Sequence, residues 1–171
     1  KREQHVAGGR WPLRRMSPPS SLFESFELLA RQGPGKLALH ECSGTHRSSR
    51  RALLDQAQIA ARSLRDSGLR PGDPVLVHAS GRSLVVSMLA VWARDGFALL
   101  ADPQLPGREL DTIEESFEPR FLVTTASGGG PRVEACENPR GPSHQPLPAR
   151  TARIKPHSGS HGRPRGIAGA A

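Results

Sequence analysis

Apolar residues follow two different periods along residues 21–126. Four segments place them every three to four positions, which is typical of one face of an amphipathic helix: Leu22–Arg31, the stretch between Ser49 and Gly68, Gly81–Arg94 and Pro106–Glu118. Four short apolar runs are typical of strands: Leu37–Glu41, Pro74–His78, Phe97–Ala101 and Arg120–Thr124. Because strands and helices alternate, the pattern predicts an α/β fold with a parallel, doubly wound sheet.

The longest predicted helix carries capping residues at both ends. Ser48 or Ser49 precedes its first turn and can accept a hydrogen bond from a free backbone N–H, and Gly68 follows its last turn. Its apolar stripe consists of Leu53, Ala57, Ala60, Ala61 and Leu64. The next strand contains the unbroken apolar run Val75–Val77, which predicts burial on both faces of the sheet. In such a sheet, ligands bind at the carboxyl ends of the strands.

Proline and glycine divide the rest of the chain. We expect residues 1–20 to form an irregular lead-in, residues 21–126 the α/β part, and residues 127–151 a Pro/Gly-rich linker. Residues 152–171 form the last segment and continue the Gly/Pro-rich irregular tail. Within it, Ala152–Ile154 is apolar enough to add one short final strand.

The net charge of +8 lies in the two ends of the chain. Residues 21–126 carry nearly equal numbers of basic and acidic side chains, whereas residues 1–20 and 127–171 carry the excess of basic ones. The chain has no Tyr, and only 4% of its residues are aromatic, so stacking partners for bases are scarce. Nucleic-acid binding is therefore not expected of the α/β part. A basic tail that binds nucleic acid or an acidic partner stays an alternative.

Membrane insertion and a disulfide framework are not expected either. No run approaches the roughly 20 apolar residues that span a bilayer, and the first residues have no signal-peptide pattern. Cys42 and Cys136 lie far apart with no paired spacing, which indicates neither a disulfide framework nor a Cys-based zinc site. These features favour a cytoplasmic location.

Two other groups of polar residues have ordinary interpretations beside the functional ones. His40, Cys42 and His46 lie at the end of a predicted strand, where they suit either a metal site or a surface turn. A charge run on the last predicted helix indicates a solvated helix face. It consists of Glu114, Glu115 and Glu118.

The segment after the short final strand has the composition of a phosphate-binding loop. Glycines allow backbone N–H groups to approach a ligand, two serine hydroxyls can donate hydrogen bonds, and an arginine can bind phosphate oxygens with two N–H groups. The candidate phosphate-binding residues are Ser158, Gly159, Ser160, Gly162, Arg165 and Gly166. A Gly-rich tail produces similar strings by accident, so the composition alone leaves a solvated tail open.

The order of these residues resembles the signature [ST]-S-G-[ST]-T-G-x-P-K-G of the AMP-forming ligases. This superfamily includes acyl- and aryl-CoA synthetases, luciferases and the adenylation domains of nonribosomal peptide synthetases. Six of the nine constrained positions agree between His157 and Gly166. Arg165 replaces the lysine conservatively, and His157 and His161 replace two hydroxyl residues.

Two earlier blocks resemble the same superfamily in the same order. Residues 68–75 are similar to its G-V-x-P-G-D-x-V block, and residues 89–103 are similar to its A-x-x-x-A-G-x-x-x-x-P-L-D-P block. There are departures: Leu100 or Ala101 stands for the proline of the second block, and Ala52 stands for the carboxylate of an early T-Y-x-E-L motif. The fold implied is the start of the large N-terminal domain of these ligases.

The resemblance implies an activity that uses ATP. The family activates a carboxylic acid with ATP, accompanied by Mg²⁺, to an acyl-adenylate, and passes the acyl group to CoA or to the phosphopantetheine of a carrier protein. No catalytic residue of the family maps onto this chain, since the adenine-binding segment and the C-terminal lysine domain would follow Ala171. We therefore expect a truncated or degenerate ligase that is not catalytic alone. A noncatalytic binding or scaffold module of the same fold is the alternative.

Overall fold

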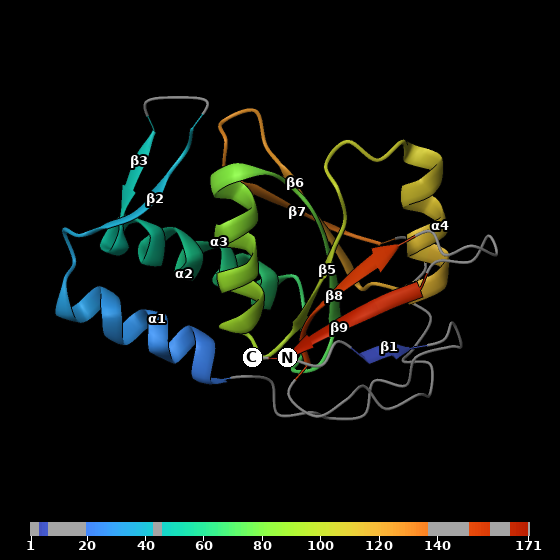
Figure 1. Ribbon diagram of the computed structural model, residues 1–171, viewed down its shortest axis with the longest axis horizontal. Helices are drawn as coiled ribbons and strands as arrows, with labels where there is room; N and C mark the ends of the chain where they lie inside the picture. Colours follow the sequence, from blue (N-terminus) through green and yellow to red (C-terminus); the bar gives the residue numbers. More distant parts are fainter. Residues whose placement is uncertain (1–3, 7–19, 43–45, 137–150, 158–164, 171) are drawn as a thin grey trace.

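The computed structural model describes residues 4–6, 20–42, 46–136, 151–157 and 165–170, and it confirms the predicted α/β class (Figure 1). The helices are α1 (Ser20–Gln32), α2 (Arg50–Asp66), α3 (Gly81–Trp92) and α4 (Gly107–Phe117). The strands are β1 (Gln4–Val6), β2 (Leu37–His40), β3 (Arg47–Ser49), β4 (Pro74–His78), β5 (Phe97–Leu100), β6 (Phe121–Thr125), β7 (Pro131–Ala135), β8 (Thr151–His157) and β9 (Arg165–Ala170).

Seven strands form one sheet in the order β1-β9-β8-β5-β4-β6-β7. Its centre is parallel, as predicted: β4 pairs with both β5 and β6, and β5 pairs with β8. The margins are antiparallel, because β7 returns beside β6 and β9 returns beside β8. The carboxyl ends of the four parallel strands therefore lie at one edge of the sheet. β2 and β3 form a separate antiparallel hairpin.

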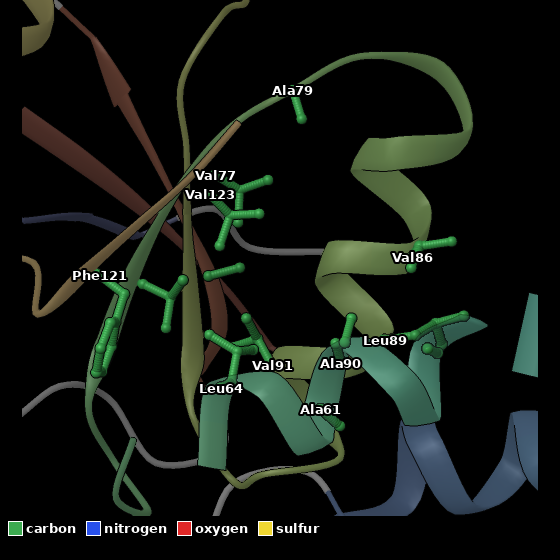
Figure 2. Packing of buried hydrophobic residues seen from close by; sticks show 14 of the residues in the cluster. Ala61, Leu64, Val77, Ala79, Val86, Leu89, Ala90, Val91, Phe121 and Val123 are labelled. Carbon is green, nitrogen blue, oxygen red and sulfur yellow. The ribbon is translucent and has the colours of Figure 1, made fainter. Parts of the chain in front are cut away.

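The core lies on both faces of the central strands. On one face, Val75 and Val77 pack with Val123 of β6 and with buried residues of α2 and α3 (Figure 2). On the other face, Leu76 packs with Leu99 of β5 and with the buried side chains of α4. All three residues of Val75–Val77 have 0% exposure, so the prediction of burial on both faces is confirmed.

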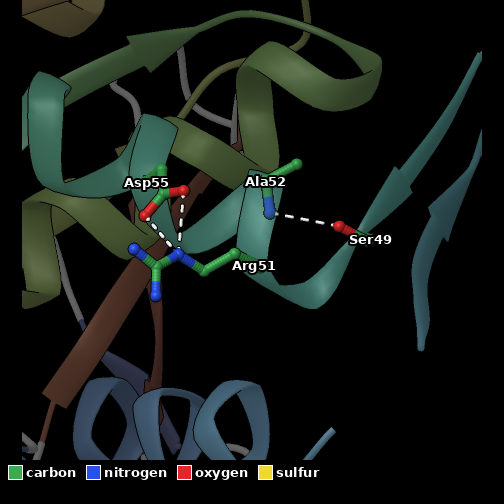
Figure 3. A network of polar contacts seen from close by, with 4 residues as sticks. All are labelled: Ser49, Arg51, Ala52 and Asp55. Atoms are coloured by element: carbon green, nitrogen blue, oxygen red, sulfur yellow. Dashed lines mark hydrogen bonds and ion pairs between the residues drawn. The ribbon is translucent and has the colours of Figure 1, made fainter. Parts of the chain in front are cut away.

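Ser49 starts α2, as one of the two predicted caps. Its hydroxyl accepts a hydrogen bond from the backbone N–H of Ala52 at 3.2 Å (Figure 3). In a full capping box a Glu or Gln at the position of Ala52 would return a bond to the cap. Here the first turn is instead supported by Arg51, whose Nε lies 2.9 Å from Oδ1 of Asp55 one turn later. α2 therefore has the hydrogen bond to the capping serine, while Ala52 has no side-chain acceptor to return one.

Four strands lie where the sequence predicted irregular chain. β1 falls in the lead-in, β7 falls in the expected linker, β9 falls in the irregular tail after the expected final strand, and β3 falls between the predicted turn and the helix that starts at Ser49. All four lie at a sheet margin or in a hairpin, and β7 carries the exposed ion pair Arg132–Glu134. Such strands are held by hydrogen bonds to a neighbouring strand, which apolar periodicity does not reveal. The predicted turn at residues 43–45 lies outside the described residues.

Glu118 ends α4 in a conformation that favours glycine, with φ 46° and ψ 53°. We expect Glu118→Gly to raise the free energy of unfolding by about 1 kcal/mol, because a Cβ is disfavoured in the left-handed region. Urea unfolding would measure the change. Glu115→Gly, inside the same helix, is the control and should lower stability by up to about 1 kcal/mol. Equal destabilisation by both changes would contradict the strain at Glu118.

Candidate functional site

The candidate phosphate loop is held by the two strands that flank it. β8 pairs parallel with β5 through Ala98 with Arg153 and Leu99 with Ile154. The carboxyl end of β8 therefore lies at the same edge of the sheet as that of β5. β9 returns antiparallel from this edge, with Arg165 opposite His157. Both ends of the loop are thus anchored at the edge where parallel sheets bind ligands.

The predicted loop residues divide into two groups. Ser158, Gly159, Ser160 and Gly162 lie outside the described residues, so their role stays a prediction. Arg165 and Gly166 are the first two residues of β9. The structure therefore places these two residues at the loop end of the β8–β9 hairpin.

Gly166 has a packing reason to be glycine. It is buried, and it pairs with Pro156 of β8. A Cβ at this position would lie 2.6 Å from Cγ2 of Ile154 and 3.2 Å from Cε1 of Phe117 on α4. The first distance is shorter than atoms tolerate, so α4 and the β8–β9 hairpin approach each other at a place where only glycine fits.

Gly166→Ala should lower the free energy of unfolding by about 1–3 kcal/mol, because the added methyl group overpacks the contact with Ile154 and Phe117. Thermal or urea unfolding would measure the loss. Gly35→Ala is the matched control, since a Cβ there meets nothing within 4 Å, and it should change stability by less than about 0.5 kcal/mol. Two equally small effects would show that Gly166 is not needed for packing.

A pocket of about 780 Å³ opens between the β2–β3 hairpin, the first turn of α3 and the β6–β7 connection. His40, Cys42 and His46, the three residues near the predicted turn, all line this pocket. Among the described residues, however, no group of three or more His, Cys, Asp or Glu side chains is arranged to hold a metal ion. The structure thus assigns these residues to a pocket wall.

Ser83 also lines this pocket, and the sequence did not predict it as a site residue. Ser83 is 2% exposed, and in the described structure its Oγ has no hydrogen-bond partner. The one signal in the sequence was its place shortly after the buried strand Pro74–His78, at the edge where ligands bind. Burial and a missing partner are tertiary properties, so they were not visible in the sequence.

The predicted solvated face of α4 is partly wrong. Glu114 is partly buried, and its pKa is raised by burial and then by the nearby charge of Asp111.

Burial also raises the pKa of the Cys136 thiol to about 11, with further contributions from Glu114 and Glu134. A thiol with such a pKa is protonated near neutral pH, so Cys136 is a poor nucleophile. Both cysteines are free.

Cys136 should react with iodoacetamide at pH 8 at least tenfold more slowly than the exposed Cys42, because only about one thiol in a thousand is ionised three pH units below its pKa. Mass spectrometry of the two peptides over time would give both rates. Glu114→Gln should speed the reaction of Cys136, since it removes one charge that raises the pKa. Glu115→Gln is the control and should leave the rate unchanged. Similar rates for the two thiols in the unmodified protein would contradict the raised pKa.

No helix in the described part of the chain is long and apolar enough to cross a bilayer.

Curated relatives of this chain are named as synthetases or synthases. Nonribosomal peptide synthetase dtxS1 of Metarhizium robertsii is 32% identical over 160 residues, which cover 84% of this chain and 2% of that protein. Syringomycin synthase SyrB1 of Pseudomonas syringae pv. syringae is 29% identical over 167 residues, which cover 89% of this chain and 27% of that protein. The chain thus spans a small part of the length of these relatives.

Two solved structures share the fold. The N-terminal subdomain of NpsA from Klebsiella oxytoca, in complex with 3-hydroxyanthranilyl-AMSN, matches with a TM-score of 0.64 at 18% identity over 91% of this chain and 40% of that chain. The crystal structure of IdnL1 matches with a TM-score of 0.61 at 25% identity, over 80% of this chain and 32% of that one. Both cover only part of the solved chain.

The chain also matches a protein-family model. The model that describes AMP-binding enzymes matches residues 26–160, which include the four parallel strands of the sheet and the residues Ser158–Ser160. The chain therefore belongs to the family of AMP-binding enzymes.

Proposed function

We propose that this chain is the N-terminal part of an adenylating enzyme and that its β8–β9 loop binds the phosphates of ATP. The observation that carries the proposal is the position of the loop. The signature-like sequence lies between paired His157 and Arg165, at the carboxyl edge of the parallel sheet. This is the edge at which open α/β sheets bind nucleotides.

The loop would act electrostatically. In the reaction of the family, a carboxylate oxygen of the acid attacks the α-phosphorus of ATP, and the bond to pyrophosphate breaks. The Ser158 and Ser160 hydroxyls and the Arg165 guanidinium would stabilise the negative charge on the β- and γ-phosphates and on the departing pyrophosphate. Backbone N–H groups at Gly159 and Gly162 can approach the oxygens closely, since no Cβ intervenes.

Mg²⁺ would accompany the nucleotide. Such an ion takes most of its ligands from phosphate and water and few from protein. This fits the described part of the chain, which groups no three metal-ligating side chains. The contribution of this chain is therefore hydroxyl groups, backbone N–H groups and one guanidinium.

The acid substrate and the acyl acceptor follow from the relatives. Because one curated relative is a nonribosomal peptide synthetase and a solved structure with this fold is an adenylation–PCP di-domain, we propose a carboxylic acid as substrate and a phosphopantetheine carrier protein as acceptor, with CoA as the alternative acceptor. The chain covers 40% of the NpsA chain that it matches, so other parts of an adenylating enzyme would complete the site and supply its catalytic residues. Two free cysteines suit a reducing compartment, and we place the protein in the cytoplasm.

Protection against thermal unfolding by MgATP tests the phosphate loop. At a nucleotide concentration ten times the Kd, the unmodified protein should gain about 1.4 kcal/mol, or roughly 3–6 °C in Tm. The double variant Ser158→Ala/Arg165→Ala should lose this gain, because it lacks one hydroxyl donor and the guanidinium. Differential scanning fluorimetry would measure both.

Arg153→Ala is the charge-matched control for that experiment, since Arg153 is an exposed residue of β8 away from the loop. It should keep the full protection. Protection that survives in the double variant would overturn the phosphate-loop assignment. Affinity for nucleic acid that falls steeply with salt and does not depend on Arg165 would favour a basic tail instead.

A further inference from the structure

The pocket next to α3 lies at the same sheet edge as the phosphate loop, but different elements form it. Its walls come from the β2–β3 hairpin, the first turn of α3 and the residues that link β6 to β7. In Figure 1 the first turn of α3 and the β6–β7 connection lie at the same end of the molecule. The loop follows β8, and β5 and β4 separate β8 from β6 in the sheet order. We propose that this pocket is a second binding site, which takes a small molecule through a phosphate or carboxylate group held at the N-terminus of α3.

The N-terminus of α3 already holds an oxyanion. Oε1 of Glu41, on the hairpin, accepts a hydrogen bond of 2.7 Å from the backbone N–H of Arg82. The capping residue of this helix, Ser80, makes no side-chain capping bond. The first turn therefore relies on an acceptor from outside the helix, and its dipole favours a negative group there.

Ser83 supplies an unused donor beside that terminus. Ser83 is buried and is one of the residues that line the pocket, and its Oγ has no partner in the described structure. Ser87, one turn later on the same helix, is equally buried, but its hydroxyl donates to the carbonyl oxygen of Ser83 at 2.7 Å. A buried hydroxyl without a partner is costly, so the Ser83 hydroxyl is matched to a ligand atom that enters the pocket.

The charges around the pocket favour an anion. Arg82 lines it, and a Cβ built on Gly129 would lie 3.7 Å from Nη2 of Arg82, so the guanidinium reaches the β6–β7 side. Together with the helix dipole, this cation outweighs the single negative charge of Glu41. His40 and His46 on the hairpin can add donors. A volume of about 780 Å³ is ample for a small polar molecule.

Amide NMR on the ¹⁵N-labelled 171-residue chain tests the site. The protein is titrated at constant ionic strength with inorganic phosphate and, separately, with acetate, which distinguishes the two kinds of oxyanion. Saturable shifts should centre on the amides of Gly81, Arg82, Ser83 and Gly129 with at least one probe. Ser83→Ala should weaken that binding at least fivefold, because it removes a donor to a charged group.

Ser87→Ala is the matched control: it removes a buried serine hydroxyl from the same helix outside the pocket and should keep the affinity. Glu41→Gln is a second variant and should raise the affinity, because it removes the charge that repels the incoming anion. Circular dichroism and thermal unfolding of each variant would show that it is folded. Shifts that rise linearly without saturation, that are confined to residues near Arg165, or that have the same affinity in Ser83→Ala would overturn the proposal. Failure here leaves the MgATP experiment on the β8–β9 loop unaffected.

Discussion

β4 has no exposed side, and this burial governs the arrangement of the other elements. Val75 and Val77 pack beneath α2 and α3, while Leu76 faces the α4 layer, and all three have 0% exposure. A strand buried on both faces needs a helical layer over each face and a hydrogen-bonded neighbour strand on each side. β5 and β6 are these neighbours, and both pair with β4 in parallel. The other strands of the sheet lie beyond β5 and β6 in the strand order.

Parallel pairing has a functional consequence, because it brings the carboxyl ends of four strands to one edge. The β8–β9 loop leaves this edge at one place, and the pocket beside α3 opens at another. The helix that follows β4 begins at the same edge, so its N–H groups face the side on which ligands approach. One topological constraint thus places both proposed sites.

Contacts between residues far apart in the chain stabilise both regions. Gly166 allows the β8–β9 hairpin to lie against Phe117 of α4, and Glu41 on the β2–β3 hairpin binds the first turn of α3. In each case one residue takes part in a contact between elements that are far apart in the sequence. Gly166 is also the last position of the segment that resembles the phosphate-loop signature, and in this chain it has a packing role.

Local patterns determined the helices, the central strands, the α2 cap at Ser49 and the burial of Val75–Val77, because these depend on the period of apolar residues and on bonds within one turn. They also determined the family, through ordered motifs. The tertiary structure alone decided β1, β3, β7 and β9, which are held by hydrogen bonds to a partner strand. It likewise decided the unpartnered Ser83 hydroxyl and the partial burial of Glu114. The physical reason is that desolvation and strand pairing depend on what folds against a residue, and the apolar pattern around that residue does not specify it.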